Sequence, residues 1–291
     1  MPADLLERRV RFGDTTYGPC LHYATVFDWV ICAIEELGEK LDYTCDEIVS
    51  KGGIPYGPVD VTARMDRYPT YGDRVLITGV PVYVSDRSFQ VEYELSRVTG
   101  DERFGRVRVV SVTLAPDGTP EPLPGHVKER LRALTDGLDR DDCLATVDDD
   151  PVTFAAGEET FAVRRTFRTP HIEAVDLGYF EDYARFVAAG LEKYLETTGT
   201  SLAGLCEATD WWPFQPREWH LTFNDMVRFE DEMTIRGSIE SVDDTTLAVA
   251  FDGESDDDRR IEGRIAYGCC DDTGAFVPRP KAMTDALEPV R

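Results

Sequence analysis

The stretch RYPTYGDRVLI, Arg67–Ile77, recurs in the second half of the chain as DMVRFEDEMTI, Asp225–Ile235. The offset of 158 positions pairs Asp73 with Asp231. Outward from this stretch, further segments align in the same order: Phe12–Asp14 with Thr169–His171 at an offset of 157, Ser88–Val91 with Thr246–Val249 and Gly105–Val107 with Gly263–Ile265 at 158, and Pro124 with Pro280 at 156. The shared order predicts two diverged copies of one unit.

The two copies are joined by a segment rich in Asp and Gly. We assign residues 1–135 to the first copy, 136–158 to an acidic linker and 159–291 to the second copy. The linker composition is typical of a segment with little regular structure.

The predicted elements follow the same order in both copies. A short strand comes first, at Leu6–Phe12 and at Phe161–Phe167. A long helix follows, at Tyr23–Leu37 with Gly38 as its stop, and at Leu177–Glu196. The first helix is apolar nearly all round, which predicts that it is buried rather than laid on a surface.

Segments with period-two alternation come after each helix. The apolar residues of the clearest ones are Phe89, Val91, Tyr93 and Leu95 in the first copy and Leu247, Val249 and Phe251 in the second. This alternation predicts strands with one buried face. A short helix is expected at His126–Leu134. The pattern indicates an α+β fold in which an antiparallel sheet wraps a buried helix.

The charge balance is strongly acidic. The chain has 56 Asp and Glu against 31 Lys and Arg, a net charge of −25, and only five of the basic residues are lysines. Such a surface suits a halophilic protein, because in molar salt the Debye length falls to about 3 Å and self-repulsion is screened. The sequence has no basic patch, so nucleic-acid binding is not expected.

The seven cysteines are scattered and form no CxxC pair, and no His stands at zinc-ligand spacing. We therefore expect reduced thiols and no metal site. The N-terminus MPADLLERRVRF lacks the apolar region of a signal peptide. No run of about 18 apolar residues is present to span a membrane. These features predict a cytoplasmic protein without membrane association.

Two segments resemble a known family. VRFGDTTY at Val10–Tyr17, continuing to Tyr23 and Trp29, resembles the opening of hot-dog enzymes of the 4-hydroxybenzoyl-CoA thioesterase type, and so does His171–Phe186. The family pattern is a strand, then Asp-x-Asp-x-x-Gly, then an aromatic-rich helix start. The resemblance covers both halves of the chain. It implies a double hot-dog fold, as in the tandem acyl-ACP thioesterases, and an acyl-CoA thioesterase activity.

The resemblance also implies catalytic residues. The family's second acidic position, its catalytic carboxylate, falls on Glu173 in the second copy. In the first copy it falls on Thr16, which departs from the pattern and cannot replace a carboxylate. The family's first acidic position holds Asp14 and His171 in the two copies. Glu173, His171 and Asp14 are therefore the candidate catalytic residues.

Hydrolysis of a thioester also requires a donor for the developing oxyanion. The unpaired N–H groups and positive dipole end of a helix N-terminus supply one. The amide that the family uses falls on Phe180, with Tyr23 as its counterpart in the first copy. Tyr179, His22 and Thr16 complete the candidate oxyanion and substrate-binding residues.

Other residue types carry weaker expectations. Arginines can bind the phosphates of CoA, and Arg164, Arg165 and Arg168 cluster before Glu173, although balancing nearby acids is an equal alternative. Asp176 is expected to cap the second helix, and Trp211–Trp212 to form a pocket wall or core. The histidines His126 and His220 are assigned to structure.

The leading hypothesis is hydrolysis of an acyl-CoA or acyl-ACP thioester, with no cofactor beyond the CoA of the substrate. One alternative is a non-catalytic acyl-CoA-binding protein, which Thr16 favours. The other is an enoyl-CoA hydratase, although the Asp-x-Asn-Pro-x-His motif of those enzymes is absent. The sequence leaves open the acyl group, the choice between CoA and carrier protein, and homo-oligomerisation of the double hot-dogs.

Overall fold

A computed structural model of the chain describes residues 3–16, 18–100, 102–135, 143–144, 151–152, 154, 159–172, 176–199, 201–209, 212–279, 281 and 284–285. The elements of the first half are β1 Ala3–Arg9, α1 Tyr23–Leu41, α2 Cys45–Ser50, β2 Ile54–Met65, β3 Arg74–Val84, β4 Ser88–Arg97, β5 Arg103–Leu114 and α3 Gly125–Thr135. Those of the second half are β6 Phe161–Thr166, α4 Phe180–Thr197, α5 Leu202–Thr209, β7 Trp212–Phe223, β8 Glu232–Val242, β9 Leu247–Ser255, β10 Asp258–Cys270 and β11 Phe276–Val277.

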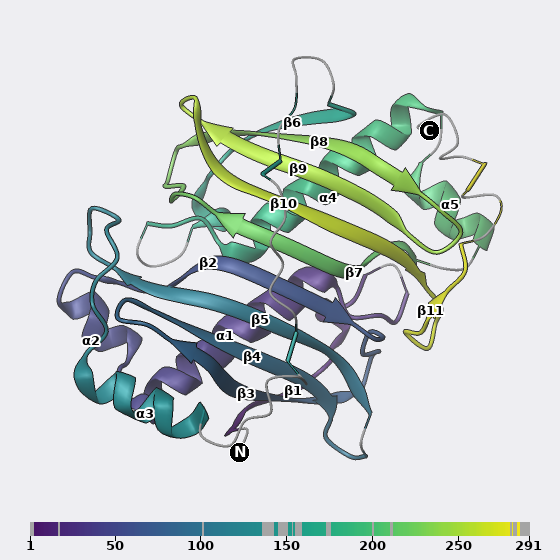
Figure 1. Cartoon of the computed structure of the whole chain (residues 1–291). Helices are drawn as coiled ribbons and strands as arrows, with labels where there is room; N and C mark the ends of the chain where they lie inside the picture. The colour runs from purple at the N-terminus through teal and green to yellow at the C-terminus, as the bar shows by residue number, and fades with distance from the viewer. Residues whose placement is uncertain are drawn as a thin grey trace.

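The described strands form one continuous antiparallel sheet in the order β1-β3-β4-β5-β2-β7-β10-β9-β8-β6, with β11 paired to β10 (Figure 1). The two halves meet in the middle of this sheet, where β2 pairs with β7. Beside this seam His220 Nε2 lies 2.7 Å from Asp60 Oδ2. Each half therefore contributes five strands to this order, and the strands follow the same sequence from the outer edge of the sheet to the seam in both halves.

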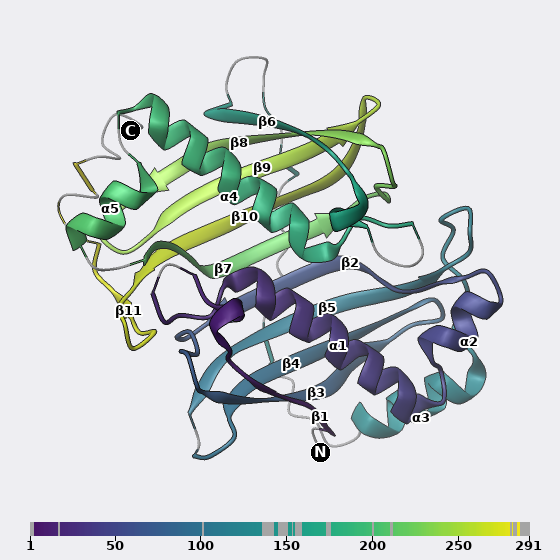
Figure 2. The same cartoon turned by 180° about the vertical axis from the view of Figure 1, so that it is seen from behind.

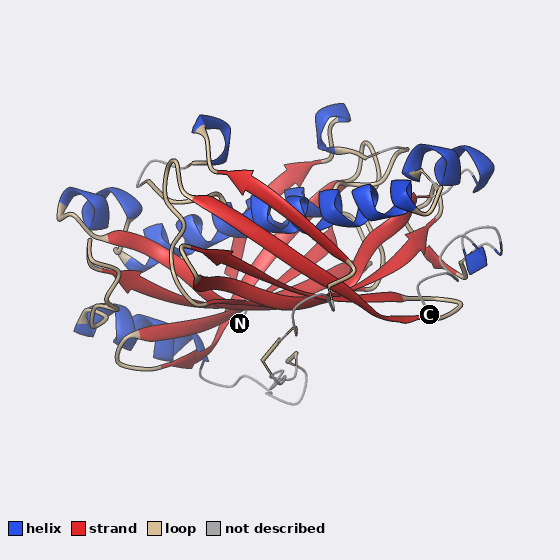
Figure 3. Ribbon diagram, turned by 90° about the horizontal axis from the view of Figure 1, so that it is seen from above, coloured by secondary structure: helices blue, strands red, loops and turns tan. Residues whose placement is uncertain are grey.

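The long helices α1 and α4 lie on the same face of the sheet and contact each other (Figure 2). Seen from above, the sheet curves around them (Figure 3). The expected burial of α1 is confirmed, because Trp29 and Phe27 are each at most 3% exposed. Burying each such side chain contributes about 1.5–3 kcal/mol, so the all-round apolar pattern of α1 is what holds it inside the curve.

The turns that carry Asp73 and Asp231 repeat the same hydrogen bonds. Asp73 O accepts from Val10 N and its Oδ2 accepts from Thr70 N, both at 2.9 Å. Asp231 O accepts from Phe167 N at 2.9 Å, and its Oδ2 accepts from Arg228 N at 2.8 Å. The aspartate is retained because its side chain closes the turn onto its own backbone. The predicted pairing of the two copies is confirmed at this turn.

One part of the predicted alignment is wrong by two residues. Met65 lies opposite Gly105 in the first half, but the equivalent Phe223 lies opposite Ile261 rather than Gly263. The hairpin between β9 and β10 is two residues shorter than that between β4 and β5, so the offset changes there from 158 to 156. The alignment matched Gly105-Arg106 with Gly263-Arg264, although these pairs do not hold equivalent places in their strands.

The predicted helix stop at Gly38 is also wrong, because α1 continues to Leu41. A Cβ at Gly38 would overlap the hydroxyl of Tyr56, so the glycine allows a side chain to approach the helix rather than ending it. The short helix expected at His126–Leu134 is confirmed within α3.

The starts of the second helix and the first strand differ from prediction. The helix α4 begins at Phe180 with Tyr179 as N-cap, not at Leu177 after Asp176. Asp176 has φ 62° and accepts from Phe229 N at 3.1 Å, so its carboxylate serves a neighbouring turn. The first strand ends at Arg9 because Phe12–Asp14 forms a 3-10 turn.

The described residues of the predicted linker contact the sheet. Leu144 N donates to Glu92 Oε2 at 2.6 Å, and Val152 N donates to Glu262 Oε2 at 2.7 Å. The boundaries at 135 and 159 stay predictions. Among the described residues, no helix is long and apolar enough to cross a membrane.

Candidate functional site

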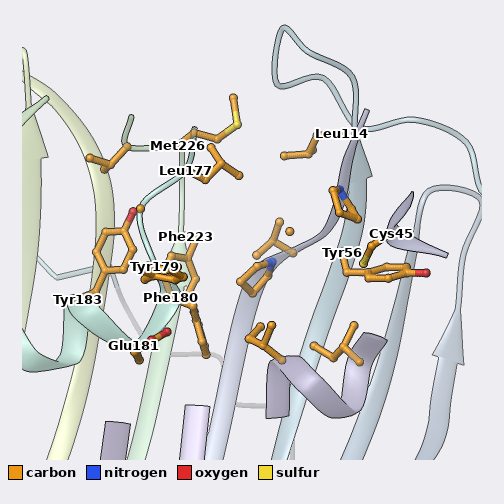
Figure 4. Close-up of a pocket in the computed structure, with 18 of the residues that line it drawn as sticks. Cys45, Tyr56, Leu114, Leu177, Tyr179, Phe180, Glu181, Tyr183, Phe223 and Met226 are labelled. Atoms are coloured by element: carbon orange, nitrogen blue, oxygen red, sulfur yellow. The ribbon is translucent and has the colours of Figure 1, made fainter. Parts of the chain in front are cut away.

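A cavity of about 660 Å³ lies where the two halves meet (Figure 4). One wall comes from the second half and carries Tyr179, Phe180 and Tyr183 from the start of α4. The opposite wall comes from the first half and carries Tyr56 and Leu114. Its volume falls within the range of small-molecule sites, and its lining combines apolar groups with a few polar ones, as such sites do.

The N-terminus of α4 borders this cavity, and hydrogen bonds of the described residue His171 connect the preceding segment to it. His171 Nδ1 accepts from Arg168 N at 3.1 Å, and His171 O accepts from Tyr179 N at 2.8 Å. Phe180 follows as the first residue of α4, where a backbone N–H has no acceptor within the helix. Phe180 thus stands at the helix start, and its role as the oxyanion-binding amide stays a prediction. Glu173 lies outside the described residues.

The sequence analysis missed the carboxylates that face this helix start. Asp28 and Glu35 both line the cavity from α1, and Glu181 lines it from the first turn of α4. Burial, followed by Glu36 and Asp28, raises the pKa of Glu35, and burial likewise raises the pKa of Glu181. Asp28 and Glu35 stand seven residues apart and share a face of α1, but α1 also carries Glu36 and Glu39, so the sequence did not single out these two acids.

A second, much smaller space of about 60 Å³ lies at the N-terminus of α1. His22 caps this helix, accepting from Ala24 N at 3.1 Å through Nδ1, and stacks on Tyr23 with ring centroids 4.6 Å apart. Burial, and then Arg185, lower the pKa of His22 to about 4, so the ring is neutral near pH 7. Glu192 lines this space from α4, 157 positions after Glu35, the offset that also separates Phe180 from Tyr23.

Side chains from β7 pack around the space at the N-terminus of α1. Gln215 is fully buried and donates from Nε2 to Leu21 O at 2.6 Å. Trp212 and Phe214 line what remains. At the equivalent place in β2, 158 positions earlier, Gly57 has no side chain and lines the open cavity. The two helix starts are thus an open site at α4 and a closed site at α1.

The structure divides the predicted site residues between these two places. Tyr179 and Phe180 line the open site, and His22 and Tyr23 line the closed one. His171, Asp14 and Thr16 line neither space and lie in the segments that precede the two helices. Asp14 Oδ2 accepts from Arg11 N at 2.8 Å, the same loop-closing bond that His171 makes in the other half. Among the described residues, neither site therefore contains predicted residues from both halves of the chain.

The three predicted phosphate-binding arginines do not line the cavity. Arg164 pairs with Glu232 at 3.3 Å and Arg168 with Glu230 at 3.5 Å, and Arg165 is exposed on β6. Their role toward CoA stays a prediction. Among the residues that the structure describes, no group of three or more His, Cys, Asp or Glu side chains is placed to hold a metal ion.

No family model and no curated protein matches this sequence. Solved structures share its fold over nearly the whole chain. A protein provisionally named oleoyl thioesterase from Lactobacillus plantarum aligns with a TM-score of 0.71 at 12% identity, over 90% of this chain and 94% of its own.

Two further structures align equally well. An acyl-ACP thioesterase from Bacteroides thetaiotaomicron VPI-5482 has a TM-score of 0.68 at 8% identity, covering 90% of this chain and 96% of its own. The 12:0-ACP thioesterase from Umbellularia californica has a TM-score of 0.69 at 10% identity, covering 91% and 93%. The chain therefore has the double hot-dog α+β fold that the sequence predicted.

Proposed function

We propose that the chain is an acyl thioesterase that hydrolyses its substrate in the open cavity. The observation that carries the proposal is the placement of Glu35, with a raised pKa, in the same cavity as Phe180, whose N–H stands at the first position of α4 and has no acceptor within the helix. The structures that share the fold include named thioesterases, which supports this reading.

The chemistry requires only water and the chain's own groups. The thioester carbonyl oxygen accepts from Phe180 N–H, where the positive end of α4 stabilises the oxyanion. Glu35 takes a proton from water as the water oxygen bonds to the carbonyl carbon. When the tetrahedral intermediate collapses, the carbon–sulfur bond breaks and the thiolate takes up a proton. The products are a free acid and a thiol, and no cofactor takes part.

Glu173 remains the second candidate for the carboxylate, because it precedes the same helix start in the chain. The substrate is an acyl-CoA or an acyl carrier protein thioester. Since the two halves together supply both the amide and the carboxylate, the proposal needs no partner subunit.

We further propose that the protein works in a salt-rich cytoplasm. The net charge of −25 and the five lysines support adaptation to salt. All seven cysteines lie among the described residues and none forms a disulfide there, which fits a reducing compartment.

The test is thiol release from short, medium, long and aromatic acyl-CoAs, measured with DTNB in molar KCl. We expect turnover by the wild type and by Asp14→Asn, because Asp14 does not line the open cavity. Glu173→Gln distinguishes the two carboxylates: it retains turnover if Glu35 is the base. Folded protein that binds these thioesters but releases no thiol would instead establish the non-catalytic acyl-CoA-binding alternative.

A further inference from the structure

The open cavity extends away from the start of α4 along α1. Phe27 packs edge-on against Phe180 with ring centroids 4.8 Å apart, which places the proposed reaction centre beside this turn of α1. Ile31 and Ile34 line the cavity further along the helix, and Glu35, which also lines it, tilts back toward the helix N-terminus and the reaction centre as helical side chains do. Its far wall includes Tyr56 of β2, on the side opposite Phe180 (Figure 4).

Tyr56 is held in an unusual way. Its backbone has φ 49°, the left-handed region that non-glycine residues rarely adopt. Its buried hydroxyl has no hydrogen-bond partner among the described residues. The ring instead packs edge-on against Tyr43 and Phe89, with centroids 5.9 and 6.2 Å away, and its hydroxyl rests on Gly38. Packing alone therefore positions the ring.

Gly38 is part of the same arrangement. It lies in the interior of α1, where glycine costs about 0.5–1 kcal/mol relative to alanine. A side chain there would displace the Tyr56 ring from its position. The strained backbone, the glycine and the hydroxyl without a partner among the described residues thus all concern one ring, and that ring forms part of the cavity wall opposite Phe180.

We propose that the cavity is a chamber for a straight, medium-length aliphatic acyl chain and that Tyr56 determines the longest chain it accepts. This inference rests on the proposed thioesterase function. From Ile31 to Gly38, α1 rises by about 10 Å at roughly 1.5 Å per residue. An extended chain of single bonds advances roughly 1.2 Å per bond, so about eight carbons fill this length.

The binding of alkyl chains of different length reports the length of the chamber without requiring turnover. The probes are S-alkyl-CoA thioethers with chains of four to sixteen carbons, which cannot be hydrolysed, titrated by calorimetry in molar KCl. Each buried methylene tightens binding about fourfold, so the Kd of the wild type should fall steeply to about eight carbons and then level or rise. Tyr56→Ala should move this break to chains about three carbons longer, because the ring it removes equals a few methylenes in volume.

The matched control is Phe214→Ala, which removes the equivalent ring of the closed site and should leave the break unchanged. Tyr56→Phe keeps the ring and should also leave it unchanged. If Tyr56→Ala does not fold, Tyr56→Gly replaces it, because glycine adopts φ 49° without strain.

Turnover of the matching acyl-CoAs separates the two proposals. A wild type that binds with a break but hydrolyses nothing would overturn the thioesterase function and leave the chamber standing. A break that stays at the same chain length in Tyr56→Ala or Tyr56→Gly would overturn the role of Tyr56, whatever the turnover. A Kd that is independent of chain length in the wild type would overturn the chamber itself.

Discussion

The open site at α4 and the closed site at α1 share one backbone plan and differ in what fills it. In both, a 3-10 turn leads to a helix start, and a carbonyl two residues after the turn's start, Asp14 O or His171 O, accepts from the N-cap amide at 2.7 or 2.8 Å. A glutamate stands at the same position of the facing helix, Glu35 or Glu192. The backbone and the carboxylate are thus present twice.

The side chains of β2 and β7 make the difference. Gly57 lines the open site without a side chain, whereas the buried Gln215 donates to Leu21 O just before α1. The cavities of about 660 and 60 Å³ follow from this exchange and from Trp212 beside it. Duplication preserved the frame because the sheet and core require it, and divergence at a few β7 positions removed the space for a ligand from one copy.

The largest expected effect separates the two glutamates. Glu35→Gln should lower kcat by about 10²–10⁴, the usual contribution of general base catalysis, and Glu192→Gln should change it less than threefold. Because burial raises the pKa of Glu35, the acid limb of wild-type kcat/KM should have its midpoint above the usual glutamate value. Steady-state thiol release over pH 4–8 checks both; equal losses in the two variants would contradict the assignment.

Substitutions at Gly57 and Gln215 test whether these two strand residues decide which site is open. A Cβ at Gly57 would meet Leu114 Cδ1 at 3.4 Å, so a side chain fits there, and Gly57→Gln should raise KM at least tenfold by filling the cavity. Gln215→Gly should lower the free energy of unfolding by about 1–3 kcal/mol, because Leu21 O loses a buried partner. Kinetics and urea unfolding measure these; unchanged KM in Gly57→Gln would mean that substrate binds elsewhere.

The closed site should make the protein sensitive to acid. His22 has a folded-state pKa of about 4, below its usual 6.5, so the unfolded chain takes up a proton that the folded one refuses. Stability is therefore lost as pH falls from about 6.5 to about 4. Burial raises the pKa of Glu192, which has the opposite effect on the pH dependence of stability, but a variant at His22 keeps this glutamate.

The comparison is between the wild type and His22→Asn, which keeps a capping acceptor but does not titrate. The Tm difference between them, measured by circular dichroism, should change in favour of the variant as pH falls through this window. A difference that is constant from pH 7 to pH 4 would show that His22 is not buried in its neutral form.

The smallest expected effect concerns two buried tyrosines. The Tyr56 hydroxyl has no partner among the described residues, so Tyr56→Phe should leave the free energy of unfolding unchanged or raise it by about 1 kcal/mol. Tyr68 Oη donates to Pro216 O at 2.7 Å, so Tyr68→Phe should lower it by about 1 kcal/mol. Denaturant unfolding of the pair checks the sign; a loss in Tyr56→Phe would reveal a partner for its hydroxyl.

Local pattern was sufficient for much of the fold. The repeat around Asp73 and Asp231 and the apolar run of α1 predicted two copies, each with a buried helix and a wrapping sheet. The errors occurred where a distant residue decided a local feature. Gly38 continues a helix because Tyr56 packs on it, and the alignment of Gly105 with Gly263 failed because a short hairpin shifts the register.

The candidate site was predicted only in part. The helix start at Tyr23 was located from the sequence, and that of α4 was placed three residues too early, at Leu177 rather than Phe180. Glu35 was missed, since one acid among 56 acidic residues gives no local signal of what it faces.

The sequence by itself determined the two α+β copies, the acidic charge and the start of the first helix, because periodicity, charge and repeat can be read along the chain, and the family resemblance implied the double hot-dog fold. Only the tertiary structure decided which helix start is open. The open site has Gly57 at the strand position where the closed site has Gln215, and it also contains a glutamate from the other half of the chain. These residues come together only when β2 and β7 pair.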